Sequence, residues 1–575
     1  MNSYPDRPNK ASRNPSGSVR LMLTAVGGNL LIASTLTLTL MGGMVFALIM
    51  AFIFIQDSAN PSQGLVIAIV LTILFNLVSF FISPWIMDLT QQWLYKTRWV
   101  NLDEIGRYSP ETVKIIEQIC QQKNLKQPRL GIIDDQNPTA FTYGTLPNSA
   151  RVVVSQGLFT YLDDDEIAAV YAHELGHVVH WDFAVMTLAS TLVQIYYLFF
   201  VFARRIGRHS DKAKDALQAL SLAAYLFYLV GTFLLLYLSR IREYFADHFA
   251  AQVTGNPNAL SRALVKIAYG LVEEGRREPE PSRLMEGTRA LGICDHKAAV
   301  TTGTAYRISA SPERLGRVFL WDMFNPWGWW MELQSTHPLT GKRIRALTNY
   351  AEQLDLTVEF DMARVVKEGK TLSKQKLYGG FFFDLFLYLA ETIGFFIGLI
   401  IGSILAVQTG YKGLAIGGIF LGLGVGILVK ALVMFPSYKQ APETDILSLM
   451  ADPYASPLRG KPAKLNGTLI GRGDAGYIFG SDLQFQDKTG LLYLRYSSRF
   501  GPIGNFLFGM SRVKNLIGSQ TKTLGWFRRG SASWLDLIRL ETESGTIVNS
   551  YHRFWSFLIS IVLILLGSYL TFSFS

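Results

Sequence analysis

Long apolar segments are the feature that most restricts how this chain can fold. The first runs from Leu21 to Ile55, and the last covers about residues 555–573. A helix of about 20 apolar residues crosses the hydrocarbon core of a bilayer, and a water-soluble core rarely needs blocks of this length. Only 17% of the residues are charged, against roughly a quarter in soluble domains. The pattern therefore predicts a multi-pass α-helical membrane protein.

Seven spans are expected. The first apolar stretch is too long for one upright span and too short for two, so it is either one tilted helix or an interfacial lead-in followed by a span. The third and fourth segments form a helical hairpin that returns to the side of the membrane it left. The predicted spans are 34–55, 65–87, 183–203, 217–238, 377–407, 412–435 and 555–573.

The sequence between the spans predicts two folded parts. In residues 96–182 we expect a helix near 110–122, short strands near 129–133, 139–143 and 150–155, and a helix from Asp163 to about Asp182. Residues 437–552 alternate short apolar runs with Gly-rich turns, which predicts a small all-β domain resembling an OB-like barrel. The expected domains are a basic tail (1–20), two spans (21–88), a first soluble part (89–182), the hairpin (183–238), a second soluble part (239–376), two spans (377–436), the β domain (437–553) and a last span (554–575).

Charge predicts how the chain is oriented. The N-terminal tail, residues 367–376 and Arg553 are basic, whereas loop 56–64 carries no Lys or Arg. The positive-inside rule therefore puts both folded parts in the cytoplasm, and we expect a bacterial plasma (inner) membrane. The basic hairpin tip, 204–216, disagrees, so either the hairpin does not fully cross or the rule fails there.

Residues 171–177 carry the strongest chemical signal, a His-Glu-x-x-His motif made by His173, Glu174 and His177. On a helix, positions i and i+4 share a face, so both imidazoles can bind one metal ion. Glu174 lies beside them, where it can take a proton from a metal-bound water. His180 falls off this face, so we expect a surface or packing role for it.

A second acidic helix is expected after the hairpin. Glu243 and Asp247 are also four residues apart, and the hairpin brings them back beside the first helix. Catalytic zinc needs three protein ligands and an open fourth position, and Glu243 can supply the third. Asp247 can accept the other ring N–H of a ligand histidine, or it can form an ordinary salt bridge with a nearby arginine. His248 lies off the ligand face.

The sequence HELGH, the membrane hairpin and the sequence REYFADHFAA together resemble the HtpX-type membrane zinc endopeptidases, which are relatives of the CAAX prenyl proteases. The resemblance covers about residues 20–350. Residues 138–144 resemble the family's N-A-F-x-x-G segment, with Thr139 in place of the usual Asn, and residues 335–344 resemble its S-T-H-P…R-I segment. It implies a mainly α, gluzincin-type catalytic domain with a small edge sheet, a Zn²⁺ cofactor and Glu243 as the third ligand.

The implied activity is hydrolysis of peptide bonds in membrane or membrane-proximal proteins, for processing or quality control. Zinc would activate the attacking water and Glu174 would act as general base. A substrate strand would pair with an edge strand, and the candidate residues are Ala140, Phe141, Val152 and Val153. His337 would bind substrate or stabilise the tetrahedral intermediate, or else cap a helix before Pro338.

The expected partners are protein or peptide substrates and membrane lipid. No nucleic acid is expected, because the β domain lacks a stripe of aromatic and basic residues. The sequence does not indicate an oligomeric state. The alternative is a membrane scaffold that acts through its β domain and keeps only a vestigial metal site. The intact general base and all three ligands argue against it.

Three further features leave alternatives open. Asp384 and Glu391, in the fifth predicted span, are functional, serve helix packing or mark a misplaced boundary. The tryptophans at 321, 327, 329 and 330 form a substrate groove or an interfacial belt. Residues 500–510 are apolar but contain Gly and Pro, which predicts a loop that either enters the membrane surface or covers the barrel. Residues 273–283 are predicted to be flexible.

Overall fold

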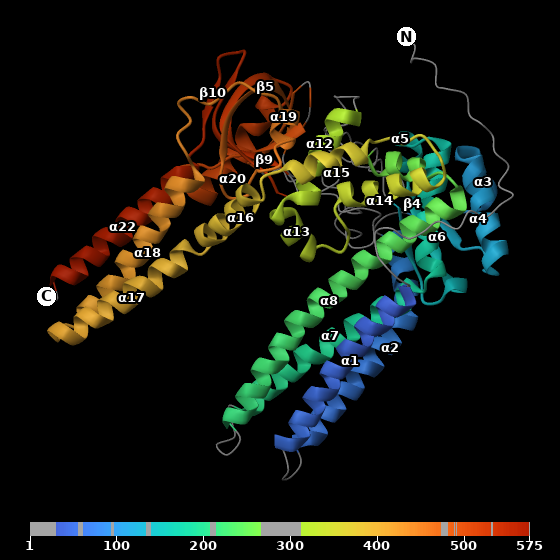
Figure 1. Ribbon diagram of the computed structural model, residues 1–575, viewed down its shortest axis with the longest axis horizontal. Coiled ribbons are helices and arrows are strands. Elements are labelled where there is room, and N and C mark those ends of the chain that lie inside the picture. The colour runs from blue at the N-terminus through green and yellow to red at the C-terminus, as the bar shows by residue number, and fades with distance from the viewer. Residues whose placement is uncertain are drawn as a thin grey trace.

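The computed structural model contains two helical bundles that extend in the same direction from the folded part of the chain (Figure 1). One bundle comprises α1, α2, α7 and α8, and the other comprises α17, α18 and α22. The structure describes residues 30–55, 61–93, 97–133, 140–207, 214–265, 312–472, 481–487, 489, 491–530 and 533–573. The basic tail 1–20, residues 138–139, the centre of the hairpin tip and the charged stretch 273–283 lie outside this set.

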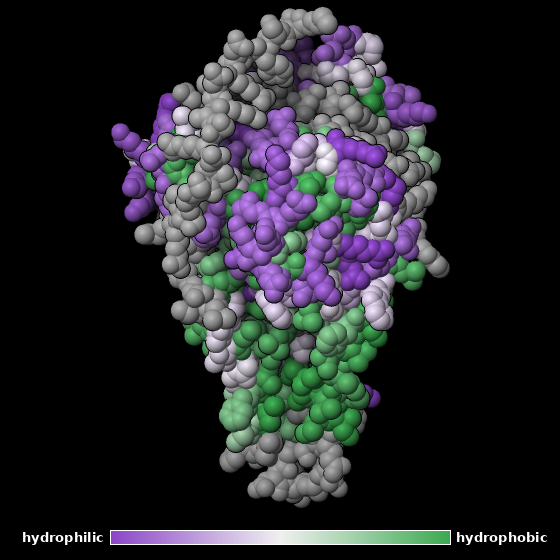
Figure 2. All heavy atoms as spheres, turned by 90° about the vertical axis from the view of Figure 1, so that its right-hand side faces the viewer, coloured by the Kyte–Doolittle hydropathy of each residue, from purple (hydrophilic) through white to green (hydrophobic). Residues whose placement is uncertain are grey.

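Seven helices among the described residues are long and apolar enough to cross a membrane, which confirms the expected multi-pass helical fold. They are α1 (Leu30–Ile55), α2 (Pro61–Trp93), α7 (Asp182–Gly207), α8 (Lys214–Thr254), α17 (Ala390–Thr409), α18 (Gly413–Met434) and α22 (His552–Ser573). Hydrophobic surface covers the lower part of the molecule in Figure 2, and a mainly hydrophilic surface lies above it. This division is what a bilayer around the helices requires.

The fifth span begins later than predicted. The segment 377–407 is divided between α16 (Lys374–Tyr388) and α17, and the candidate span is Ala390–Thr409. Asp384 is fully buried in α16, where it accepts hydrogen bonds from Trp327, Ser456 and Arg459. Asp384 therefore belongs to a contact between folded parts, and the predicted span boundary was wrong.

The first folded part surrounds helix α6. Its elements are β1 (Arg98–Val100), α3 (Leu102–Tyr108), α4 (Pro110–Lys123), β2 (Arg129–Ile133), β3 (Ala140–Tyr143), η1 (Pro147–Ser149), β4 (Arg151–Ser155), α5 (Gln156–Tyr161) and α6 (Asp164–Val179). The amide of Asp163 donates to the Glu166 carboxylate at 2.9 Å, and acidic residues in the first turn favour the positive helix N-terminus. The helix ends before the predicted Asp182, because Trp181 has a left-handed φ of 60° and a new helix, α7, begins there.

Helix α8 joins the membrane to the catalytic part. It runs without interruption for 41 residues. The predicted span at 217–238 and the acidic helix around Glu243 are therefore parts of one continuous helix. Figure 1 shows this helix passing from the first bundle to a position beside α6. Gly176 of α6 lies so close to α8 that an added Cβ would be 3.1 Å from the Cα of Ala246. The two helices that carry the motif residues are thus in direct contact.

Among the described residues, four further helices belong to the catalytic part, and tryptophans lie on two of them. The helices are α12 (Pro312–Phe324), α13 (Pro326–Leu333), α14 (Thr340–Gln353) and α15 (Met362–Thr371). Trp321 and Trp327 are buried, whereas Trp329 and Trp330 are 55% and 39% exposed. The four tryptophans therefore do not form one surface feature. The Trp330 ring centroid lies 6.2 Å from that of Phe381 in α16.

The C-terminal domain is a closed five-stranded barrel with the predicted OB-like fold. Strands pair in the order β9–β7–β6–β5–β8, and β8 also pairs with β9 to close the barrel. Strands β7 and β9 are parallel, and the other barrel pairs are antiparallel. Strand β10 pairs antiparallel with the second half of β9. The elements are α19 (Ile446–Met450), β5 (Lys461–Arg472), β6 (Leu483–Gln486), β7 (Leu491–Arg495), α20 (Gly501–Ser511), α21 (Val513–Leu516), β8 (Gln520–Arg528), β9 (Trp534–Thr542) and β10 (Ile547–Asn549).

The loop predicted at 500–510 is helix α20. Pro502 lies in the first turn, where its missing N–H costs no hydrogen bond, and Gly501 takes the left-handed φ of 61° that starts the helix. The glycines and the proline thus shape the start and the packing of a helix rather than break it.

Candidate metal centre

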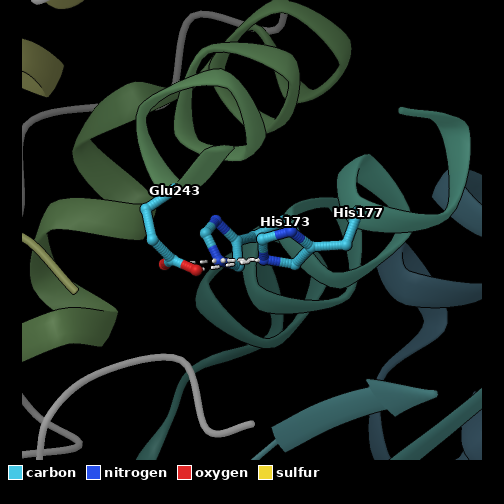
Figure 3. A group of neighbouring side chains, drawn as sticks. All are labelled: His173, His177 and Glu243. Carbon is cyan, nitrogen blue, oxygen red and sulfur yellow. Dashed lines mark hydrogen bonds and ion pairs between the residues drawn. The ribbon is translucent and has the colours of Figure 1, made fainter. Parts of the chain in front are cut away.

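Three side chains from two helices converge on one point. His173 and His177 come from α6 and Glu243 from α8, and they point toward one another (Figure 3). Their ligand atoms lie within 4.8 Å of one another. The two imidazole Nε2 atoms are 3.3 Å apart, and the Glu243 carboxylate oxygens lie 3.6 Å from His173 and 3.5 Å from His177. Two imidazoles and one carboxylate are a donor set typical of catalytic zinc.

Each histidine is oriented by a carboxylate at its other ring nitrogen. Nδ1 of His173 lies 3.0 Å from Asp247, and Nδ1 of His177 lies 2.5 Å from Asp182. An Nδ1–H that faces a carboxylate leaves the Nε2 lone pair directed at the centre of the cluster. The structure thus brings Asp247 to the position expected from the sequence, where it also pairs with Arg343.

Glu174 is buried beside the cluster. One carboxylate oxygen, Oε2, accepts a hydrogen bond of 2.6 Å from the hydroxyl of Thr142 on β3. The other, Oε1, is buried and accepts no hydrogen bond, and the same is true of Oε2 of Glu243. Burial raises the pKa of the Glu174 carboxyl, although the nearby His173 and His177 oppose this effect. Buried acceptors rarely lack partners, so these residues fit a cation together with its bound water.

His337 also points into the site. Its Nε2 lies 3.4 Å from the Glu243 carboxylate, and its Nδ1 lies 2.9 Å from the Thr336 hydroxyl. The N-cap of α14 is Leu339, with no capping side chain. The geometry therefore does not support a helix-capping role for His337.

A cavity of about 460 Å³ opens next to these residues. Its walls come from both the catalytic part and the membrane bundle: β3, α6 and the segment around His337 on one side, and α2, α7 and α8 on the other. The residues from α2 are Phe80, Ser83, Pro84 and Met87. The cavity beside the site is therefore bounded in part by membrane-spanning helices.

The four residues predicted to pair with substrate lie on two strands with different positions in the sheet. In the four-stranded sheet, with order β1–β2–β4–β3, strand β3 with Ala140 and Phe141 lies at an edge. Strand β4 is central, because Val152 and Val153 pair with β2 on one side and β3 on the other. No strand can be added to a strand already paired on both sides. Val152 and Val153 were therefore wrong as substrate-pairing residues.

The two neighbouring histidines lie away from the cluster. His180 packs edge-on against Phe245 and Phe249, and burial lowers its pKa to about 4. His248 packs against the ring of Tyr350 at 5.3 Å. Both positions agree with the packing roles expected from their place off the ligand face.

Three residues of the site were given no role from the sequence. Asp182 meets His177 because the chain turns at Trp181, and no helical spacing predicts this contact. Arg242 pairs with Asp182 and donates to the carbonyl of His180 at 2.7 Å. Thr142 lies in the segment that resembles N-A-F-x-x-G, and this resemblance was the only feature of the sequence that could have indicated a role for Thr142. Its contact with Glu174 depends on how the sheet packs on α6.

Comparisons with known proteins agree with this site. Residues 109–351 match peptidase family M48. A protease HtpX homolog of Methanothermobacter thermautotrophicus is 30% identical over 246 residues, which cover 42% of this chain and 89% of that protein. One from Pyrococcus furiosus is 32% identical over 297 residues, covering 51% of this chain and 89% of that protein.

A relative from Aquifex aeolicus, also a protease HtpX homolog, is 28% identical over 302 residues, covering 51% of this chain and 86% of that protein. Among solved structures, Ste24p of S. mikatae gives 21% identity with a TM-score of 0.29, covering 42% of this chain and 59% of that one. The barrel domain lies beyond the residues matched to family M48.

The seven spans, the helix pair and the cluster of two histidines and one glutamate are those of an integral-membrane metalloprotease. The chain belongs to peptidase family M48, among its HtpX-like members.

Proposed function

We propose that the chain is a zinc-dependent endopeptidase that hydrolyses peptide bonds of membrane or membrane-proximal proteins. The main support for this proposal is the convergence of His173, His177 and Glu243 on one point. Beside them lies the buried carboxylate of Glu174, of which only one oxygen accepts a hydrogen bond. The first three residues would hold Zn²⁺. When bound, the metal supplies Lewis-acid polarisation of the scissile carbonyl and lowers the pKa of a coordinated water.

Glu174 acts as the general base and returns the proton to the leaving amine. Its free oxygen is available for this proton, while the hydrogen bond from Thr142 fixes the other oxygen. His337 lies beside the Glu243 carboxylate and contacts the substrate or the tetrahedral oxyanion.

Substrate binds in the cavity along β3. Strand β3 lies at the edge of its sheet, and its residues Thr142 and Tyr143 line the cavity, whereas Ala140 and Phe141 are fully buried. An extended peptide would pair along this edge from Thr142 onward. Because α2 and α7 form the other wall, a substrate can reach Glu174 from the membrane side. This access favours peptide bonds close to a membrane span over those of a fully soluble protein. We place the catalytic and barrel domains in the cytoplasm, on a bacterial inner membrane, from the basic flanks of the spans.

The test compares purified full-length protein with its Glu174→Gln variant, in detergent with zinc, on an unfolded protein substrate. We expect cleavage by the wild type and a loss of at least about a thousandfold in the variant, because the base is removed while the metal ligands remain. Equal rates would favour the vestigial scaffold. Proteomics of membranes from cells that hold either form then identifies the substrates that accumulate with Glu174→Gln.

A further inference from the structure

The base of the barrel domain is attached to the ends of two spanning helices. The amide of Gly460 and the guanidinium of Arg528 each donate to the carbonyl of Met434, the last residue of α18, at 3.0 Å. On the other side, His552 at the start of α22 bonds to the carbonyl of Arg495 at 2.9 Å. These contacts keep the base of the barrel at the level where α18 and α22 leave the membrane.

Helix α20 lies at this base, next to the first turn of α22 (Figure 1). The indole N–H of Trp555 donates to the carbonyl of Ser498 at 3.4 Å, and its ring lies 3.7 Å from where a Cβ on Gly501 would be. Tryptophans of membrane proteins concentrate at the headgroup level. Trp555 therefore marks the interface, and α20 begins at the same level.

One face of α20 is fixed to the barrel. The Phe508 ring stacks on Tyr496 with centroids 3.9 Å apart, and the Asn505 side chain accepts from the Ser498 amide at 2.7 Å. At Gly504 the helix approaches so closely that a Cβ would lie 2.1 Å from the Ser498 hydroxyl. The helix cannot rotate its other face into the barrel while these contacts hold.

That other face is apolar and exposed. Ile503, Leu507 and Met510 are 73%, 51% and 53% exposed, and Phe500 precedes them at 66%. These residues follow helical spacing, so they form one continuous strip. A strip of this kind on a folded soluble domain marks a contact surface rather than chance.

The charges around the apolar strip indicate what covers it. Arg499, Arg512 and Lys514 are exposed at its two ends, and residues 488–535 contain no Asp or Glu. Basic residues beside an apolar helix face favour anionic headgroups at the surface of a bilayer. A partner protein would need an acidic, apolar surface brought to the same level, whereas the bilayer is already there around α22.

We propose that α20 is an interfacial helix that inserts Phe500, Ile503, Leu507 and Met510 into the lipid beside α22, with its basic ends on anionic headgroups. The barrel is then held to the membrane at a third point besides α18 and α22. Its orientation over the bilayer is fixed, and so is that of the catalytic part with which it shares a buried core. This role does not depend on peptidase activity.

The test uses full-length protein in lipid nanodiscs, with Cys120 and Cys294 replaced by serine. Single cysteines at Ile503→Cys and Leu507→Cys carry an environment-sensitive fluorophore, and Ser544→Cys, in the turn between β9 and β10, is the matched control. Strand β10, three residues or about 10 Å of extended chain, lies between this exposed turn and the start of α22. We expect blue-shifted emission at 503 and 507 that spin-labelled lipids quench at least twofold more than at 544.

The lipid composition gives a second readout. Quenching at 503 and 507 should be stronger in discs containing phosphatidylglycerol than in discs of phosphatidylcholine alone, and Arg499→Gln/Arg512→Gln/Lys514→Gln should remove this difference. Emission and quenching equal to those at 544 would overturn the proposal. A blue shift without lipid quenching would also overturn it, because a protein surface, such as a second copy of the chain, would then cover the strip.

Discussion

Arg343 and Asp247 form a buried, two-pronged ion pair behind the metal cluster. Nε and Nη2 of the guanidinium donate to the two carboxylate oxygens at 2.9 Å and 2.6 Å, and both side chains are essentially inaccessible to solvent. The same carboxylate faces Nδ1 of His173. Arg343 therefore sets the plane of Asp247, and Asp247 sets the ring of His173. The sequence left two roles open for Asp247, as an acceptor for a ligand histidine or as the partner of an arginine. Asp247 has both roles, because it contacts His173 and Arg343.

Arg343→Lys should weaken zinc binding by about 10–100-fold, the range seen when such outer partners of ligands are changed. Lysine keeps the charge but cannot donate two parallel hydrogen bonds to one carboxylate. Competition with a chromogenic chelator measures the affinity. Arg345→Lys, at an exposed position of the same helix, is the control and should leave it unchanged. Wild-type affinity in Arg343→Lys would show that the two-pronged geometry is unimportant.

Glu243→Ala and Glu174→Gln should separate metal binding from catalysis. The first removes a proposed ligand, so both activity and zinc content should fall. The second keeps the three ligands, so the protein should retain one zinc per chain and lose activity. Elemental analysis of the purified proteins gives the zinc content. Full occupancy in Glu243→Ala would remove this residue from the ligand set.

His180→Ala and His248→Ala should retain zinc and most of the activity. Both rings pack against aromatic side chains away from the cluster. The expected cost is a moderate loss of stability, which thermal melting in detergent would detect. His177→Ala is the comparison. If either variant lost zinc as fully as His177→Ala, the assignment of faces on α6 and α8 would be wrong.

Gly176→Ala should impair the site without touching a ligand. The new methyl group would meet the backbone of Ala246 at 3.1 Å and the Phe249 ring at 3.3 Å, so α6 and α8 must separate slightly. Because ligands come from both helices, zinc affinity and activity should fall together, the activity by about tenfold or more. Gly379→Ala, where an added Cβ has no neighbour within 4 Å, is the matched control. Unchanged kcat and zinc affinity in Gly176→Ala would refute this account.

Asp384→Leu should loosen the contact between the barrel and the catalytic part. It leaves the Trp327 indole and the Ser456 hydroxyl without their buried acceptor, at a cost of about 1–3 kcal/mol for each unsatisfied group. Glu391→Gln is the control, because that carboxylate is 44% exposed and forms one ion pair, with Lys430. Melting curves that shift equally for both variants would contradict the structural role of Asp384.

The sequence by itself determined the features that depend on local spacing and on solvent. Apolar length predicts the spans because the bilayer thickness is fixed. The spacing in His173–His177 and Glu243–Asp247 predicts shared helix faces because the helical repeat is fixed. The alternation of apolar and polar residues, interrupted by Gly-rich turns, predicts the barrel strands because side chains of a strand alternate between its two faces. Each of these predictions needs only neighbours along the chain.

Only the tertiary structure decided which segments meet. The turn at Trp181 brings Asp182 back to His177, and the order of the sheet leaves β3 at the edge while it buries β4. Asp384 is buried outside the candidate span by hydrogen bonds from Trp327, Ser456 and Arg459. Helix α20 packs closely on the β domain at Gly504 and Phe508. These outcomes depend on how the chain turns and on which elements pack together, and the spacing of residues within one helix or strand does not contain this information.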